Sequence, residues 1–182
     1  MATPQTHFAA EVRGPEPDLI ERLRAGDPDA LTLTWQAHAS GLLLLAGRLL
    51  GPADGPDAVQ DLFVALPEAM GQYQEQGQFA AWLRRLLVRI ALMRLRSQRR
   101  RRETALAEEL LPVPVAAFSG AGQLDLTRAL ARLAPEHRTV VVLKALEGYS
   151  HEEIAQLLGI RRNTCEVRYH RALRLLRDML EA

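Results

Sequence analysis

The stretch from Glu147 to Arg174 constrains the fold most, because it carries the signals for two short helices joined by a tight turn. Ser150, followed three residues later by Glu153, matches a capping box, so we expect a helix to begin at Ser150. Gly159 stands where this helix should end, since glycine adopts the left-handed backbone conformation at low cost. The pattern then predicts a second helix from about Arg162 to the C-terminus.

The second helix combines an apolar face with a basic one. Its apolar positions recur at spacings of three and four residues, at Cys165, Tyr169, Ala172 or Leu173, Leu176 and Leu180. Arginines occupy other positions, namely Arg161, Arg162, Arg168, Arg171 and Arg174. This combination is typical of a helix-turn-helix, whose second helix lies in the major groove of DNA. The alternative is an ordinary helical hairpin with a solvated basic face.

The same region resembles a known family. From Leu133 to Leu180 it is similar to the C-terminal promoter-reading domain of bacterial sigma factors. The residues that match are Leu133, Pro135, Arg138, Gly148, Ser150, Glu153, Ile154, Ala155, Leu158, Gly159, Thr164, Arg171, Ala172, Leu173 and Leu176. The resemblance implies that the upstream promoter element is read by Arg161, Arg162, Asn163, Thr164, Glu166, Arg168 and Arg171. Arg161, Asn163 and Glu166 depart from the family, which usually has serine, glycine and a basic residue there.

The net charge of +1 conceals a strong asymmetry along the chain. Nine of the 23 basic residues are arginines between Leu83 and Arg102, a stretch without any acid. The remainder carries 14 basic against 22 acidic residues, or −8. This distribution favours a confined contact with a polyanion over a generally adhesive surface.

The composition gives no indication of an enzyme. The single cysteine, Cys165, excludes an internal disulfide, and its place on the inner face of its helix favours a packed thiol. The five histidines show no metal-ligand spacing, and we expect no cofactor. No stretch resembles a signal peptide or is apolar enough to span a bilayer, so we expect no membrane contact and a cytoplasmic protein.

The N-terminal half also predicts helices. Asp27 followed by Pro28 is a start signal, and an apolar stripe runs from there until Gly51. A third helix should begin near Asp57 and be interrupted at Pro67, because proline lacks the N–H that a helix interior needs. After a polar loop over residues 74–78, one long helix should follow, with its apolar stripe beginning at Phe79 and its other positions increasingly arginine.

From Asp27 to Arg102 the chain resembles the core-binding and promoter-melting domain of extracytoplasmic-function (ECF) sigma factors. The motifs AGDxxAL, DxVQDxF and GxFxAWL occur in the order of that family and are followed by an arginine-rich helix end. The resemblance implies that Asp57, Gln60, Asp61 and Val64 dock on a coiled coil of the largest subunit of core RNA polymerase. An anti-sigma factor is a further partner that the resemblance implies.

The resemblance also implies contacts with the downstream element of promoter DNA, through Gln78, Phe79, Trp82, Arg85, Arg89, Met93 and Arg96. The two aromatic residues could stack on bases, although their spacing of three equally fits the core, which is the interpretation we favour for Trp82. The arginines, together with Arg84 and Arg94, would neutralise phosphates. Pro67, Arg89 and Met93 depart from the family, so the promoter sequence remains open.

The sequence therefore predicts an all-α protein of two small helical domains joined by a flexible linker, the C-terminal one a helix-turn-helix. We expect a loose tail over residues 1–17, a core-binding domain over 18–102, a linker over 103–123 and the DNA-reading domain over 124–182. The predicted function is that of a sigma factor that directs promoter-specific transcription initiation. The alternatives are a helix-turn-helix regulator that acts without core polymerase and a decoy that only occupies polymerase.

Overall fold

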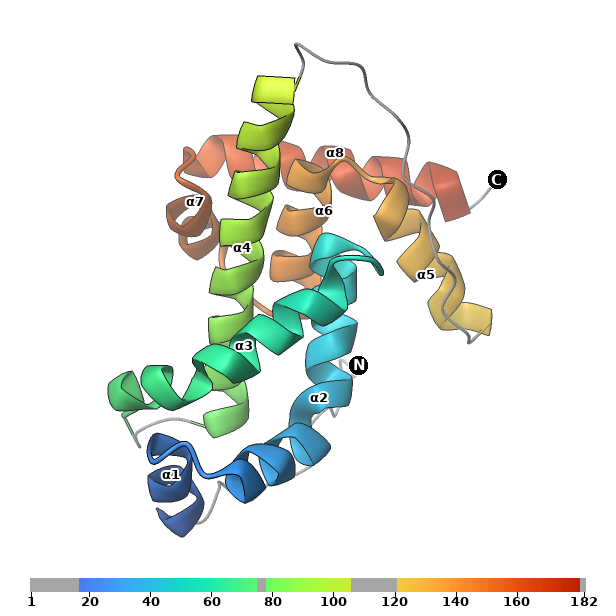
Figure 1. Ribbon diagram of the computed structural model, residues 1–182. Coiled ribbons are helices and arrows are strands. Elements are labelled where there is room, and N and C mark those ends of the chain that lie inside the picture. Colours follow the sequence, from blue (N-terminus) through green and yellow to red (C-terminus); the bar gives the residue numbers. More distant parts are fainter. Residues whose placement is uncertain (1–16, 75–77, 106–120, 181–182) are drawn as a thin grey trace, which may run out of the picture.

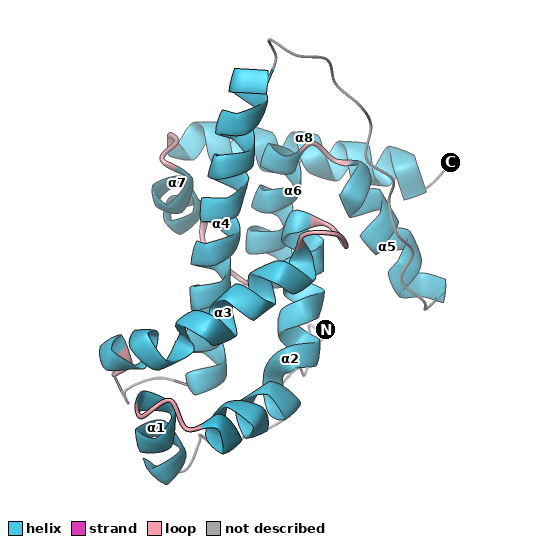
Figure 2. Cartoon of the chain, in the orientation of Figure 1, coloured by secondary structure: helices cyan, strands magenta, loops and turns pink. Residues whose placement is uncertain are grey.

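The computed structural model describes residues 17–74, 78–105 and 121–180, and these ranges consist of helices joined by short turns, with no strand (Figures 1 and 2). The α-helices are α1 (Pro17–Arg24), α2 (Pro28–Leu50), α3 (Gly55–Ala69), α4 (Phe79–Ala105), α5 (Ala121–Arg132), α6 (Pro135–Val141), α7 (His151–Leu158) and α8 (Arg162–Leu180). A 3-10 turn, η1 (Met70–Gln72), follows α3, and a π-helical turn, η2 (Val142–Leu146), follows α6. The all-α prediction is confirmed.

The corner between α1 and α2 follows the predicted start signal. Asp27 caps α2, since its Oδ1 accepts a hydrogen bond from the backbone N–H of Asp29 at 2.9 Å. Its Oδ2 accepts from Arg22 Nε at 2.6 Å, and this bond holds the pKa of the Asp27 carboxyl below its usual value. Gly26 makes the turn possible with a φ of 72°.

Helices α2, α3 and α4 form the body of the N-terminal half (Figure 1). Their fully buried side chains include Leu45, Leu49, Leu62, Leu66, Leu83 and Leu87. The tightest approach is at Gly55, where an added Cβ would lie 2.9 Å from the backbone nitrogen of Gly47. Only a residue without a Cβ lets the start of α3 pass so close to α2.

The predicted interruption at Pro67 is wrong, because α3 continues through this residue to Ala69. Pro67 removes only its own hydrogen bond, and it lies close to the C-terminal end of the helix. Leu66 before it and Met70 after it are both 0 % exposed. Packing of these side chains holds the last turn in place against the local preference, and the chain then tightens into η1. Helix α3 also begins at Gly55, two residues before the expected start.

In the C-terminal half, α8 crosses α5 and α6 (Figure 1). Its buried residues are Cys165, Ala172 and Leu176, which belong to the apolar stripe predicted for this helix. Burial raises the pKa of the Cys165 thiol, which keeps it protonated and suits the packed role expected for it. The π-helical turn η2 was not predicted and brings the chain to Gly148, whose φ is 76°.

The two halves are in contact. Helix α2 packs against α5 and α6, and the buried apolar side chains form one continuous cluster. Helix α4 runs beside α7 (Figure 1) and reaches Ala105, while α5 begins at Ala121, so both extend slightly into the expected linker. The rest of that linker and the N-terminal tail lie outside the described residues.

We expect Gly55→Ala to lower the free energy of unfolding by about 1–3 kcal/mol, the usual cost of forcing extra volume into a packed site. The added methyl would meet the backbone of α2, which cannot rotate away as a side chain would. Gly71→Ala is the matched control, because an added Cβ there has no atom within 4 Å. Urea unfolding of the two variants checks the prediction, and equal stability would contradict it.

Candidate nucleic-acid interface

The helix-turn-helix has the local geometry that the sequence predicts. The Glu153 backbone N–H donates to Ser150 Oγ at 3.2 Å, and the Ser150 backbone N–H donates to Glu153 Oε2 at 2.7 Å. This is a complete capping box, and it fixes the start of α7. Gly159 ends the helix in the left-handed conformation, with a φ of 66°. The chain then enters α8 at Arg162.

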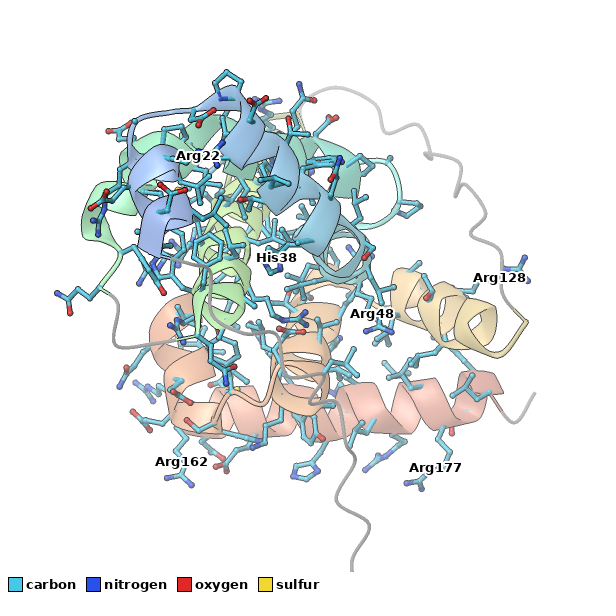
Figure 3. All side chains as sticks on the ribbon, turned by 90° about the horizontal axis from the view of Figure 1, so that it is seen from below. Arg22, His38, Arg48, Arg128, Arg162 and Arg177 are labelled. Atoms are coloured by element: carbon cyan, nitrogen blue, oxygen red, sulfur yellow. The ribbon has the colours of Figure 1, made fainter. Side chains whose placement is uncertain are left out.

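The predicted upstream-element residues lie on α8 and in the turn before it, at positions outside the buried stripe of Cys165, Ala172 and Leu176. Arg161, Arg162, Asn163, Thr164 and Arg171 are exposed, whereas Glu166 and Arg168 are half-buried. Arg162 and Arg177 extend away from the body of the molecule, at opposite ends of α8 (Figure 3). Arg162 Nε donates to Glu166 Oε1 at 2.8 Å, so the unexpected carboxylate neutralises a neighbouring arginine. This hydrogen bond holds the pKa of Glu166 below its usual value.

The four residues predicted to bind polymerase share one exposed face of α3. Asp57, Gln60 and Asp61 are exposed, and Val64 keeps 77 % of its surface accessible. Arg94 of α4 reaches this face, where its Nε donates to Asp61 Oδ2 at 2.8 Å. From the sequence, Arg94 is expected to neutralise a phosphate. Its pairing with Asp61 could not be predicted, because the two residues are 33 positions apart in the chain.

An apolar groove of about 780 Å³ borders this face, between α2 and α3. Its walls include Leu31, Trp35, Leu43, Phe63, Val64 and Pro67. Trp35 belongs to the predicted inward stripe of α2, yet 42 % of its surface is exposed. Its ring packs edge-on against Phe63, with ring centroids 4.9 Å apart.

The predicted downstream-element residues divide between core and surface. Phe79 is only 2 % exposed and packs against Tyr73, Trp82 and His38. The structure thus places Phe79 in the core and His38 at the half-buried edge of this aromatic cluster. Gln78, Arg85, Arg89, Met93 and Arg96 are exposed, and Trp82 is half-buried.

Several of these residues surround a cleft of about 420 Å³ between the end of α3 and the start of α4. It is lined by Ala69, Gln72, Tyr73, Gln74, Trp82, Arg85, Leu86 and Arg89. Amide groups, two aromatic rings and two guanidinium groups therefore meet in one concave site. Within the part of the chain that the structure describes, neither Arg85 nor Arg89 forms a hydrogen bond or an ion pair.

Two arginines of α4 contact the C-terminal half while remaining partly accessible to solvent. Arg84 binds both carboxylate oxygens of Glu147, with 2.8 Å between Arg84 Nε and Glu147 Oε2. Arg96 donates to the backbone oxygen of Leu157 at 2.6 Å. These contacts could not be predicted from the sequence, because they depend on how the two halves of the molecule pack against each other.

Among the described residues, no group of three or more His, Cys, Asp or Glu side chains is placed to hold a metal ion. A search of the described helices finds none with the length and apolar character to cross a membrane. The interface thus consists of charged, amide and aromatic groups on helices.

Two family models match the chain, in the order expected from the sequence. Residues 34–101 match Sigma-70 region 2, and residues 123–176 match Sigma-70 region 4. Among solved structures, the sigma factor RpoE in complex with the anti-sigma factor NepR from Bartonella quintana has a TM-score of 0.60 at 20 % identity, covering 83 % of this chain and 96 % of that chain. CnrH in complex with the cytosolic domain of CnrY has a TM-score of 0.51 at 28 % identity, covering 90 % and 96 %.

Curated relatives extend the likeness over nearly the whole length. The chain is 32 % identical to the RNA polymerase sigma factor CarQ of Myxococcus xanthus, over 88 % of this chain and 95 % of that protein. It is 30 % identical to the ECF sigma factor SigM of Mycobacterium tuberculosis, over 97 % and 90 %. The ECF sigma factor SigE of Mycolicibacterium smegmatis is 37 % identical over 79 % of this chain, but this match spans only 58 % of SigE.

A helical protein that combines a region 2 domain with a C-terminal helix-turn-helix belongs to the promoter-specificity factors of bacterial transcription. The chain belongs to the ECF sigma factors of RNA polymerase. The alternative of a regulator that acts without core polymerase is not favoured, because it accounts for region 4 alone.

We expect Ser150→Ala to lower the free energy of unfolding by about 1 kcal/mol at pH 7, the usual cost of losing a helix cap. The hydroxyl and the backbone N–H of Ser150 hold the pKa of Glu153 below its usual value. A carboxyl whose pKa is lowered by folding stabilises the protein above its unfolded pKa, about 4.3, and this contribution disappears as the pH falls through the folded pKa. The difference between wild type and variant should therefore narrow below about pH 4.

Ser40→Ala is the control, because Ser40 is exposed within α2 and alanine is a good helix former. Urea unfolding at pH 7 and at pH 3.5 measures both effects. A stability of Ser150→Ala equal to that of Ser40→Ala at pH 7 would show that the cap contributes nothing.

Proposed function

We propose that this sigma factor binds core RNA polymerase through the exposed face of α3. Asp57, Gln60, Asp61 and Val64 would dock on a coiled coil of the largest subunit. The exposure of Val64 on an otherwise polar face supports this assignment, because an apolar residue there gains by being covered. The adjoining apolar groove gives the same partner a second contact, with Trp35 and Phe63 in its wall.

The second part of the proposal concerns duplex DNA. Arg161, Arg162, Asn163 and Thr164 lie at the N-terminal end of α8, the end that meets base edges when a recognition helix enters the major groove. Arg168 and Arg171 would contact phosphates, which position the helix without reading sequence. Because Arg162 is paired with Glu166, the charge of Arg162 is partly neutralised within the protein. Glu166 would still be able to accept a hydrogen bond from a cytosine amino group.

The cleft between α3 and α4 is the candidate site for the opened strand of the downstream element. A half-buried ring at Trp82 offers a stacking surface, and Arg85 and Arg89 offer charge for the adjacent phosphates. Gln78, Met93 and Arg96 would extend the contact along the exposed side of the loop and α4. This arrangement needs no covalent chemistry, and the protein would act by binding alone.

The same proposal covers the organisation and the partners of the chain. Residues 18–102 would form the core-binding domain and residues 124–182 the DNA-reading domain, joined through 103–123. The structural neighbour RpoE is in complex with the anti-sigma factor NepR, which supports an anti-sigma partner for this chain as well. It would act where core polymerase is, in the cytoplasm.

In vitro transcription tests the whole proposal. Purified core RNA polymerase is incubated with fragmented genomic DNA of the source organism, with and without this protein. We expect discrete transcript starts that require the protein, and their upstream sequences would reveal the promoter elements. Binding of duplex DNA without any binding of core polymerase would overturn the proposal.

We expect Val64→Glu to weaken binding to core polymerase at least about tenfold, which corresponds to about 1.4 kcal/mol. A carboxylate at this position would lose its hydration in the interface without gaining a partner. Leu33→Glu is the matched control, because Leu33 is 50 % exposed and lies two positions before Trp35, so that it points to the opposite side of α2. Titration of labelled core polymerase with each variant measures the effect, and equal affinities would contradict it.

We expect Arg89→Ala to weaken promoter opening while leaving core binding unchanged. Loss of one phosphate contact with a single strand should reduce the slope of log K against log salt concentration by about 0.7. Arg128→Ala is the control, since Arg128 is exposed on α5, away from the cleft (Figure 3). Open-complex formation at several salt concentrations checks the prediction. A slope equal to that of the control would remove Arg89 from the site.

A further inference from the structure

One ion pair joins the two halves of the molecule across the face of α4. Two nitrogens of the Arg84 guanidinium, in α4, donate to the two carboxylate oxygens of Glu147. Glu147 lies 63 positions later in the chain, in the turn before α7. The Glu147 side chain is only 5 % exposed, whereas the Arg84 side chain is 41 % exposed. Packing of the two halves thus removes the carboxylate from water, and Arg84 compensates for this loss.

A second contact lies further along the same helix. Arg96 donates to the backbone oxygen of Leu157, near the C-terminal end of α7. Carbonyl groups in the last turn of a helix lack partners within the helix, and the negative end of the helix dipole favours a cation. The two contacts are about 18 Å apart along α4, given a rise of 1.5 Å per residue. They fasten α4 to both ends of α7.

In this closed arrangement the C-terminal half contacts the edge of the surface proposed for downstream DNA, where Arg85 and Arg96 stay exposed. Arg96 is hydrogen-bonded to α7, and Arg85 lines a shallow cleft of about 250 Å³ together with Glu147, Tyr149 and Glu153. The carboxylates in this cleft lie where phosphates would have to approach. The same helix therefore serves two competing partners, one of which is the C-terminal half of the chain.

We propose that Arg84 and Glu147 form an intramolecular latch, which holds the DNA-reading half against α4 and restricts access to the downstream-element surface. The masking role rests on the proposed function of that surface, whereas the latch itself does not. Because Arg84 remains partly in water, the pair is suited to reversible opening. A partner that draws the two halves apart, such as core polymerase, would expose the arginines of α4 to DNA.

The position of Arg48 supports a role for Glu147 as the acceptor in this interface. Arg48 of α2 lies at the boundary between the two halves (Figure 3), and its Nε is buried without a hydrogen-bond partner in the described structure. The charge of Glu147 acts favourably on this guanidinium, and that of Arg84 acts unfavourably. Removal of the carboxylate would leave Arg48 and Arg84, two like charges of the N-terminal half, without the negative charge that acts on both.

The latch is tested on the 182-residue chain alone, by small-angle X-ray scattering of Glu147→Gln, Arg84→Gln and the double variant. A compact chain of this length has a radius of gyration of about 16 Å. We expect each single variant to be larger than the wild type by several ångströms, and the double variant to be no larger than either. Asp178→Asn makes the same charge change as Glu147→Gln at an exposed position on α8 and should leave the size unchanged.

The masking is tested by binding of a single-stranded oligonucleotide without polymerase. We expect Glu147→Gln to bind at least about threefold more tightly than Asp178→Asn, although the two variants have the same net charge. Equal affinities would overturn the masking role. A Glu147→Gln variant as compact as the wild type, or additive expansion in the double variant, would overturn the latch. Since no polymerase is present, neither result depends on whether the protein initiates transcription.

Discussion

Helix α4 buries its apolar side against α2 and α3 and leaves most of its arginines at the surface. The rest of the structure depends on this constraint. Leu83, Leu87 and Ala91 are 0 % exposed on the side that faces α2 and α3. Each buried leucine contributes about 1.5–3 kcal/mol relative to an exposed one, far more than a surface ion pair. Apolar burial thus sets the rotation of α4 about its own axis, and the arginines take the positions that remain. The candidate nucleic-acid surface is a consequence of the core.

The features that depend on a few adjacent residues could be predicted from the sequence. The capping box at Ser150, the left-handed turn at Gly159 and the start of α2 at Asp27 are all confirmed. The two caps depend on a side chain that bonds to backbone within a few positions, and the turn depends on the absence of a Cβ at Gly159. Such features can be predicted from a few adjacent residues. Pro67 shows the limit of such reasoning. Its local preference was correct, but burial of Leu66 and Met70 outweighs it, and burial is not visible in a short window of sequence.

The candidate site was predictable in outline and not in its pairing. Sequence spacing placed Asp57, Gln60, Asp61 and Val64 on one face of a helix, and the structure has them exposed together. The same spacing could not distinguish the arginines of α4 from one another, because a run of like charges contains no information about distant partners. The fold separates them: Arg94 meets Asp61, Arg84 meets Glu147, and Arg85 and Arg89 line the cleft beside Trp82. Phe79 also could not be assigned from spacing, since an aromatic residue suits both core and surface.

The separation of the arginines gives the charge asymmetry of the sequence a physical meaning. A row of unpaired arginines would bind any polyanion. Paired arginines must first break their hydrogen bonds to a carboxylate or a carbonyl oxygen before they can bind one. The acidic residues that balance the basic helix come from α3 and from the turn before α7, the two elements that face its ends. On the proposed assignment, DNA would compete with partners within the same chain. A second partner that moves those elements away from α4 would then contribute free energy to DNA binding. Such competition favours DNA capture within an assembly over capture by the isolated protein.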